Sequence, residues 1–167
     1  KGKMAFISQS GALIGAILDF ALKKQIGFSH FISVGSMLDA DFGDLLNHLG
    51  NDPHVDSIVL YMEGLTHPRK FMSAARAVSR IKPIIALKSG RSAAGAKAVA
   101  SHTGSMAGED AIYDAAFRRA GIVRVDTIEA LFNAAELAAK QPVPKGAGLA
   151  VITNGGGPGV MAADALS

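Results

Sequence analysis

Hydrophobic and polar residues form two alternating patterns along this chain. Short apolar runs, typical of buried parallel strands, are separated by longer stretches in which apolar residues recur at helical spacing. Strands are predicted over residues 4–7, 29–34, 57–62, 83–88 and 122–125, and helices over 11–24, 39–49, 68–81, 109–120 and 127–140. Strands that alternate with helices are typical of an α/β fold with a parallel sheet.

A doubly wound, flavodoxin-like domain is therefore expected over residues 1–140, with a parallel sheet in the strand order 2-1-3-4-5. Residues 89–108 are rich in serine, glycine and alanine, and we expect them to form one long loop. A linker over 141–146 contains two prolines.

An extra βα unit is predicted after this linker. Residues 148–153 form an apolar run, and a glycine loop and a helix from Pro158 come next. Because one strand and one helix cannot bury a core alone, residues 147–167 are interpreted as the start of a truncated second domain that packs on the first domain or on a copy of it. The chain begins without an initiator methionine and stops within a predicted helix, which suggests a piece of a longer polypeptide.

Composition narrows the function classes. With 49% hydrophobic residues the chain is not disordered. Its net charge is only +3, its basic residues are scattered along the sequence, and 6% of its residues are aromatic, so the composition does not indicate nucleic-acid binding. The absence of cysteine excludes thiol chemistry and is compatible with a cytoplasmic location. No apolar run is long enough to predict a membrane span.

Two phosphate-cradle signatures are the first candidate chemistry. Each comes after a predicted strand and opens a helix, whose free N–H groups and positive dipole end favour an anion. The candidate phosphate-binding residues are Ser8, Ser10, Gly11 and Ala12 in the first signature and Asn154, Gly155, Gly156 and Gly157 in the second.

His102 and Glu63 are the candidate catalytic residues. His102 lies in the expected loop after the fourth strand, and Glu63 lies just after the third strand. Ligands of open parallel sheets bind where the strand order reverses, so these residues and the loop over 8–12 are expected to converge. A neutral imidazole can act as a nucleophile and carry phosphate, and a carboxylate can orient it. The four other histidines are interpreted as surface or core residues.

Other uses of this fold fit the residues less well. A receiver domain needs acidic residues after its first and third strands, where this chain has Ser8-Gln9-Ser10 and Met62-Glu63. A flavin carrier favours aromatic residues around the ring, and the chain has no tryptophan and two tyrosines. A dinucleotide-binding GxGxxG motif is absent after the first strand.

Taken together in order and spacing, several motifs resemble the nucleoside-diphosphate-forming acyl-CoA synthetases, of which succinyl-CoA synthetase is the best-known relative. The resemblance covers nearly the whole chain, and its most specific part is the segment around His102. The matching segments are Ser8-Gln9-Ser10-Gly11-Ala12-Leu13, Asp52-Pro53, Glu63-Gly64, Ser101-His102-Thr103-Gly104-Ser105-Met106-Ala107-Gly108, Ala116-Phe117-Arg118-Arg119-Ala120-Gly121 and Asn154-Gly155-Gly156-Gly157.

The resemblance implies a phosphohistidine mechanism. Acyl-CoA and phosphate give acyl phosphate and CoA, and the phosphoryl group passes to His102 and then to ADP or GDP. Glu63 matches the acid that orients the histidine, and the two cradles match two helices that face the phosphate. CoA and ATP or ADP with Mg²⁺ are the implied cofactors of the full-length protein. The implied partners are a CoA-binding domain and an ATP-grasp domain, and a homo-oligomer is compatible with the family.

A second hypothesis comes from a subgroup of this family fused to an N-acetyltransferase domain. Residues 28–39 and 69–76 resemble that subgroup, in which the synthetase-like part can be a regulatory module of a protein lysine acetyltransferase. The segment beyond Ser167 in the full-length protein would discriminate between the two hypotheses.

Overall fold

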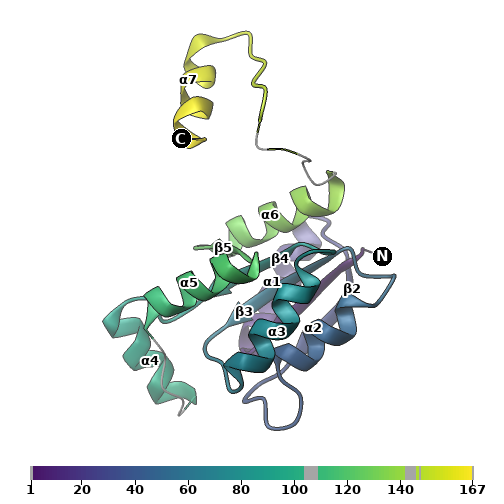
Figure 1. The fold of residues 1–167 in the computed structure, drawn as a ribbon, viewed down its shortest axis with the longest axis vertical. Helices are drawn as coiled ribbons and strands as arrows, with labels where there is room; N and C mark the ends of the chain where they lie inside the picture. The colour runs from purple at the N-terminus through teal and green to yellow at the C-terminus, as the bar shows by residue number, and fades with distance from the viewer. Residues whose placement is uncertain (1, 104–108, 142–145, 147, 167) are drawn as a thin grey trace.

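The computed structural model describes residues 2–103, 109–141, 146 and 148–166, without the side chains of residues 102, 103 and 139. Five parallel strands form one sheet in the order β2-β1-β3-β4-β5 (Figure 1). The strands are β1 (Met4–Ser8), β2 (Phe28–Ser33), β3 (Ser57–Met62), β4 (Ile84–Lys88) and β5 (Val123–Val125). The predicted strand order is confirmed.

Seven helices are assigned in the described part of the chain. They are α1 (Gly11–Lys23), α2 (Phe42–Gly50), α3 (Pro68–Val78), α4 (Ala93–Thr103), α5 (Asp110–Ala120), α6 (Ile128–Lys140) and α7 (Gly156–Ala165). Six of them lie within 140 residues of the N-terminus, and α7 lies apart from the sheet in Figure 1.

Two hydrophobic clusters cover the two faces of the sheet. Alternate strand residues point to opposite faces, so Ile58 and Leu60 join one cluster while Val59 joins the other. The first cluster includes side chains of α2, α3 and α5, and the second includes side chains of α1 and α6. The resulting three-layer body is the flavodoxin-like arrangement that the sequence predicts.

Capping side chains determine where several helices begin. The Ser10 hydroxyl accepts a hydrogen bond from the Leu13 amide at 3.2 Å and caps α1. In α2, Asp41 and Asp44 form a capping box, so the helix begins at Phe42 rather than at the predicted residue 39. Gly121, with a φ of 72°, closes α5 in the left-handed conformation that glycine adopts without strain.

The predicted loop over residues 89–108 is wrong for most of its described part, because Ala93–Thr103 forms α4. Ser92 accepts a hydrogen bond from the Gly95 amide at 3.1 Å, as a residue before a helix does. Five alanines lie between residues 93 and 100, and alanine has the highest helix propensity. The interpretation as a loop gave too much weight to the glycine and serine residues around this run.

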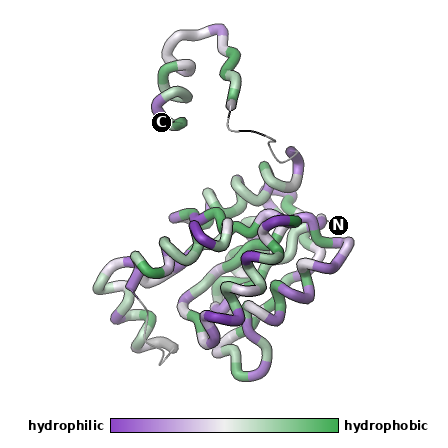
Figure 2. Tube along the Cα trace, in the orientation of Figure 1, coloured by the Kyte–Doolittle hydropathy of each residue, from purple (hydrophilic) through white to green (hydrophobic). Residues whose placement is uncertain are grey.

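The expected strand over residues 148–153 is also absent from the described residues, and only the helix of the extra βα unit forms, as α7. A strand needs a neighbour for its backbone hydrogen bonds, and this segment has none in the sheet. Figure 2 shows apolar segments in this part of the chain, and Ile152 is 98% exposed. The expected linker over 141–146 lies largely outside the described residues, so the domain division remains a prediction.

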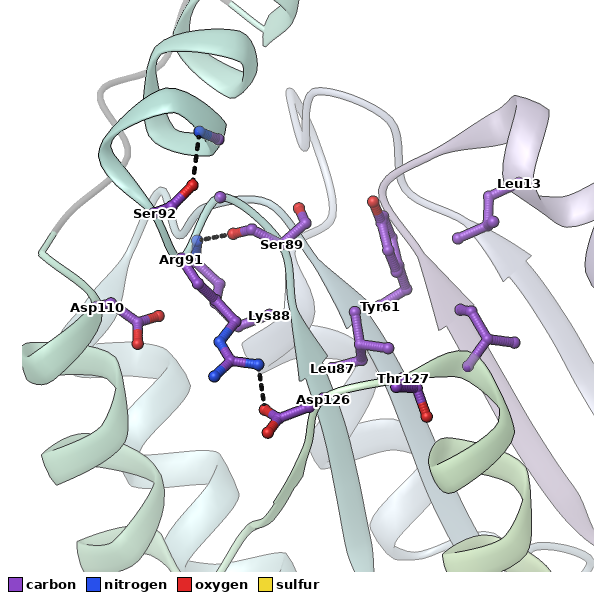
Figure 3. A pocket seen from close by; sticks show the side chains of 13 residues that line it. Leu13, Tyr61, Leu87, Lys88, Ser89, Arg91, Ser92, Asp110, Asp126 and Thr127 are labelled. Carbon is purple, nitrogen blue, oxygen red and sulfur yellow. Dashed lines mark hydrogen bonds and ion pairs between the residues drawn. The ribbon is translucent and has the colours of Figure 1, made fainter.

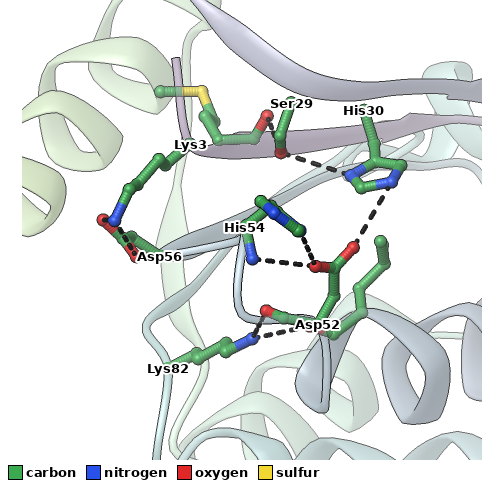
Figure 4. A network of polar contacts seen from close by, with 9 residues as sticks. Lys3, Ser29, His30, Asp52, His54, Asp56 and Lys82 are labelled. Atoms are coloured by element: carbon green, nitrogen blue, oxygen red, sulfur yellow. Dashed lines mark hydrogen bonds and ion pairs between the residues drawn. The ribbon is translucent and has the colours of Figure 1, made fainter. Parts of the chain in front are cut away.

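A polar network at the amino-terminal edge of the sheet accounts for two of the four other histidines (Figure 4). His30 and His54 both contact the Asp52 carboxylate, at 3.5 and 3.0 Å. The amide of His54 donates to the same carboxylate and lowers its pKa, an effect that burial opposes and the two imidazoles reinforce. These contacts tie the turn before β3 to β2, which is a structural role.

No helix among the residues that the structure describes is long and apolar enough to cross a membrane.

Candidate functional site

Hydrogen bonds join the carboxyl ends of the three central strands, β1, β3 and β4. The side-chain oxygen of Gln9, just after β1, accepts hydrogen bonds from the amides of Glu63 and Gly64, at 2.5 and 3.0 Å. The amide of Ser89, just after β4, donates to the carbonyl of Met62 at 2.9 Å. The loops after these strands therefore form one connected edge, as expected at the point where the strand order reverses.

The first cradle uses its serine hydroxyls internally. The buried Ser8 hydroxyl donates to the carbonyl of Ser10 at 2.9 Å and accepts from its amide at 3.0 Å, and the Ser10 hydroxyl caps α1. Gly11 and Ala12 are exposed first-turn residues, whose N–H groups have no acceptor within the helix. An anion at this site would therefore be bound by backbone N–H groups rather than by the hydroxyls.

Glu63 lies at the same edge of the sheet and is 8% exposed. Among the described residues, no hydrogen bond or ion pair within 4.0 Å ends on its carboxylate. His102 lies in the last turn of α4, and its side chain is outside the described part of the structure. Residues 104–108 of the histidine motif also lie outside it, so the expected contact between Glu63 and His102 remains a prediction.

The second cradle is not brought to the first in this structure. Asn154 and Gly155 precede α7, and Gly156 and Gly157 form its first turn. Figure 1 shows α7 apart from α1 and from the edge of the sheet that carries the first cradle. The expected pairing of two helix starts around one histidine therefore remains a prediction.

A cleft of about 880 Å³ opens over the carboxyl end of β4 (Figure 3). It lies between Leu13 in the first turn of α1, the loop that leads into α4, and the start of α6 at Thr127 and Ile128. Arg91 forms an ion pair with Asp126 in this cleft, and Asp110, the first residue of α5, also lines it (Figure 3). The cleft is thus continuous with the edge that carries the first cradle.

Sequence analysis missed two residues of this region, Gln9 and Lys88. Gln9 joins two strand ends, and its signal is a polar side chain within the first cradle. Lys88 ends β4 with its side chain buried, at 1% exposure, and a lysine that ends an apolar strand is the signal that could have found it. Burial lowers the pKa of the Lys88 ammonium, and Asp110 opposes this effect.

This chain matches a known protein family over most of its length. The model that describes a succinyl-CoA ligase-like flavodoxin domain matches residues 1–138. The chain belongs to this family. The match confirms the resemblance drawn from the sequence motifs, and it covers the whole sheet, α1 to α5 and all but the last two residues of α6.

Two relatives of this chain are ADP-forming ligases by name. The chain is 49% identical over 166 residues to the alpha subunit of acetate–CoA ligase [ADP-forming] II of Pyrococcus furiosus, in a match that covers 99% of this chain and 36% of the relative. It is 40% identical over 168 residues to the 4-hydroxybutyrate–CoA ligase [ADP-forming] of Nitrosopumilus maritimus, with 99% and 24% covered. The chain thus spans about a third or less of the length of these relatives.

A solved structure agrees with this assignment. The dinucleotide-forming acetyl-coenzyme A synthetase 1 of Ca. Korarchaeum cryptofilum, in complex with phosphate and ADP, matches with a TM-score of 0.92 and 44% identity. The match covers 98% of this chain and 36% of that chain. The flavodoxin-like fold is therefore confirmed by a related protein as well as by the strand order.

Replacing Gln9 by methionine is expected to lower the free energy of unfolding by about 1–3 kcal/mol, because two part-buried amides lose their acceptor. Urea unfolding of the wild type and the variant measures this difference. Gln9→Glu keeps an acceptor oxygen at the same position and serves as the control. Equal stability of Gln9→Met and the wild type would show that the link between the two strand ends contributes nothing.

Proposed function

We propose that this chain is the phosphohistidine-carrying domain of an ADP-forming acyl-CoA synthetase. The observation that carries the proposal is the 49% identity to the alpha subunit of an ADP-forming acetate–CoA ligase over 99% of the chain. That span includes the first cradle, Glu63 and His102. The connected edge of β1, β3 and β4 supports it, because this edge offers helix N–H groups for a phosphoryl group.

The proposed sequence of steps balances without an external oxidant or reductant. Inorganic phosphate attacks the thioester of acyl-CoA, so that CoA leaves as the thiol and acyl phosphate forms. An imidazole nitrogen of His102 then attacks phosphorus, the P–O bond to the acyl group breaks, and the carboxylate leaves. ADP takes the phosphoryl group from the imidazole, which gives ATP and the free histidine.

Each candidate residue has one proposed task. His102 carries the phosphoryl group, and Glu63 holds the imidazole in the required tautomer. The start of α1 binds the phosphoryl oxygens through the backbone N–H groups of Gly11 and Ala12, and Ser8 and Ser10 hold this turn in shape through the hydrogen bonds of their hydroxyls. The second cradle, Asn154 to Gly157, would bind them from the opposite side once the rest of its domain is present.

CoA, ADP or ATP and Mg²⁺ are proposed to bind mainly to parts of the protein outside this chain. The chain spans about a third of its relatives, which leaves room for a CoA-binding domain and an ATP-grasp domain. We expect the 167-residue chain alone to be catalytically inert. The relatives described above are named as two ligases and one synthetase, and they lend no support to the hypothesis of a regulatory acetyltransferase module.

Phosphate labelling of the parent protein tests this function. Incubation with radiolabelled ATP and Mg²⁺ is expected to leave label on the tryptic peptide of residues 98–118, which contains His102 as its one histidine. The label should be lost in acid and kept in base, as for a phosphohistidine. Label that survives acid, or label confined to another peptide, would contradict the proposal.

A further inference from the structure

We propose that the cleft over the carboxyl end of β4 binds an oxyanion, a phosphate group or a carboxylate, through the ammonium of Lys88. This proposal concerns a position other than the start of α1, and it does not require His102 or phosphate transfer. It rests on three observations in the described part of the structure: Lys88 is buried, its ammonium has N–H donors without an acceptor, and the other charged side chains around the cleft are paired with one another.

The Lys88 ammonium has unused donor capacity. It carries three N–H donors, and the one hydrogen bond found for it goes to the carbonyl of Ser89. It also lies 4.6 Å from the centre of the Tyr113 ring, a favourable distance for a cation–π contact. Within the described residues, no carboxylate lies within 4.0 Å of this ammonium. The buried Lys88 ammonium therefore has no negatively charged hydrogen-bond acceptor among the described residues.

The other charges at the cleft are already paired. Arg91 pairs with Asp126, and Arg124 pairs with Asp110 at 2.5 Å. Asp110 and Glu63 favour the charged form of Lys88 from a longer distance, whereas Arg124 disfavours it. Of the five charged side chains Lys88, Arg91, Asp110, Arg124 and Asp126, only Lys88 is left without a close partner of opposite charge.

A buried and unpaired ammonium is costly, which makes this cleft selective for anions. Removing a charge from water is unfavourable unless an opposite charge or hydrogen bonds compensate. An oxyanion in the cleft would accept hydrogen bonds from the N–H donors of Lys88 that the Ser89 carbonyl does not use, and it would restore charge balance. Ser92 lines the same cleft, and its hydroxyl accepts from the Gly95 amide and keeps its own proton for the same group. The hydroxyl of Ser89, which also lines the cleft, already donates to the carbonyl of Met62.

The walls of the cleft indicate what accompanies the anionic group. Leu13, Leu87 and Ile128 give the cleft an apolar part, and Figure 3 shows Leu13 on the side away from Asp110. A phosphate ester or a carboxylic acid with an apolar part fits such a combination. Inorganic phosphate and acetate are the simplest probes for the two sources of the oxyanion.

Lysine side-chain NMR of the 167-residue chain tests the proposal. Phosphate and acetate are titrated separately at constant ionic strength, with chloride as the balancing ion. We expect the Lys88 signal, identified by its loss in Lys88→Met, to shift and saturate with at least one probe. The pKa of Lys88 should then rise, because the bound anion favours the charged ammonium.

A pair of variants makes the result specific. Lys88→Met keeps the shape of the side chain without the charge, and it is expected to weaken the anion affinity of the cleft about tenfold or more. Lys97→Met removes an exposed lysine of α4 and is expected to leave the affinity unchanged. A response to phosphate alone or acetate alone would support the proposal and identify the source. If neither probe shifts the Lys88 signal, the proposal is overturned. This holds also where the amide signals of Gly11 and Ala12 shift, because that response would place the anion at the start of α1 instead.

Discussion

Replacing His102 by alanine in the parent protein is expected to abolish phosphoenzyme formation and to lower the rate of acyl-CoA synthesis by at least about a thousandfold. The expected loss is large because no other group in the proposed scheme can take the phosphoryl group from acyl phosphate. Binding of nucleotide should persist, since the change removes one side chain of this domain. The measurement is label incorporation from radiolabelled ATP together with steady-state synthesis of acyl-CoA.

His48→Ala is the matched control for this experiment. His48 is an exposed histidine of α2 with no proposed chemical role, so the variant should take up label and turn over like the wild type. If His102→Ala kept full acyl-CoA synthesis, the phosphohistidine hypothesis would fail. Loss of activity in both variants would point to a general effect of histidine replacement rather than to His102.

The sheet was predictable because its signal is local and repeated. Each of the runs 57–62 and 83–88 is apolar at nearly every position, as both faces of a central parallel strand are buried. The alternation with helices predicts a parallel sheet, and 2-1-3-4-5 is the strand order of flavodoxin-like doubly wound folds. The matching family and the solved relative confirm this fold.

The two wrong predictions have different physical causes. For α4, the alanine-rich composition of residues 93–100 outweighed the glycine and serine residues on either side, and helix propensity decided the outcome. For residues 148–153, the local pattern is that of a strand, but strand formation depends on a partner that this chain does not supply. A strand predicted from local sequence therefore forms only where a neighbouring strand is present to pair with it.

The candidate site was predictable at the level of loops but not of contacts. Ser8 to Ala12 and Glu63 could be assigned to one edge because parallel strands end at the same side of the sheet. The hydrogen bonds that Gln9 accepts from the amides of Glu63 and Gly64 depend on the register of β1 against β3, which no local pattern contains. The burial of Lys88 likewise depends on α5 packing over the end of β4.

Replacing Leu46 by alanine is expected to lower the free energy of unfolding by about 2–5 kcal/mol, the largest stability effect predicted for this chain. Leu46 lies in α2, is 0% exposed, and belongs to the cluster that joins α2, α3 and α5 to the sheet. Truncation removes buried apolar surface and leaves a cavity that a packed core refills only in part. Urea unfolding of the chain measures the change in free energy. In thermal unfolding, the midpoint temperature should fall by roughly 5–15 °C.

Leu22→Ala tests whether burial, rather than the loss of a leucine from a helix, causes the effect. Leu22 also lies in a helix, α1, but it is 77% exposed, so the same truncation should change the stability by less than about 0.5 kcal/mol. Because both variants replace leucine by alanine within a helix, the difference in helix propensity cancels in the comparison. Similar losses in the two variants would mean that burial of Leu46 is not the cause, and that the packing of α2 on this face of the sheet is incorrect.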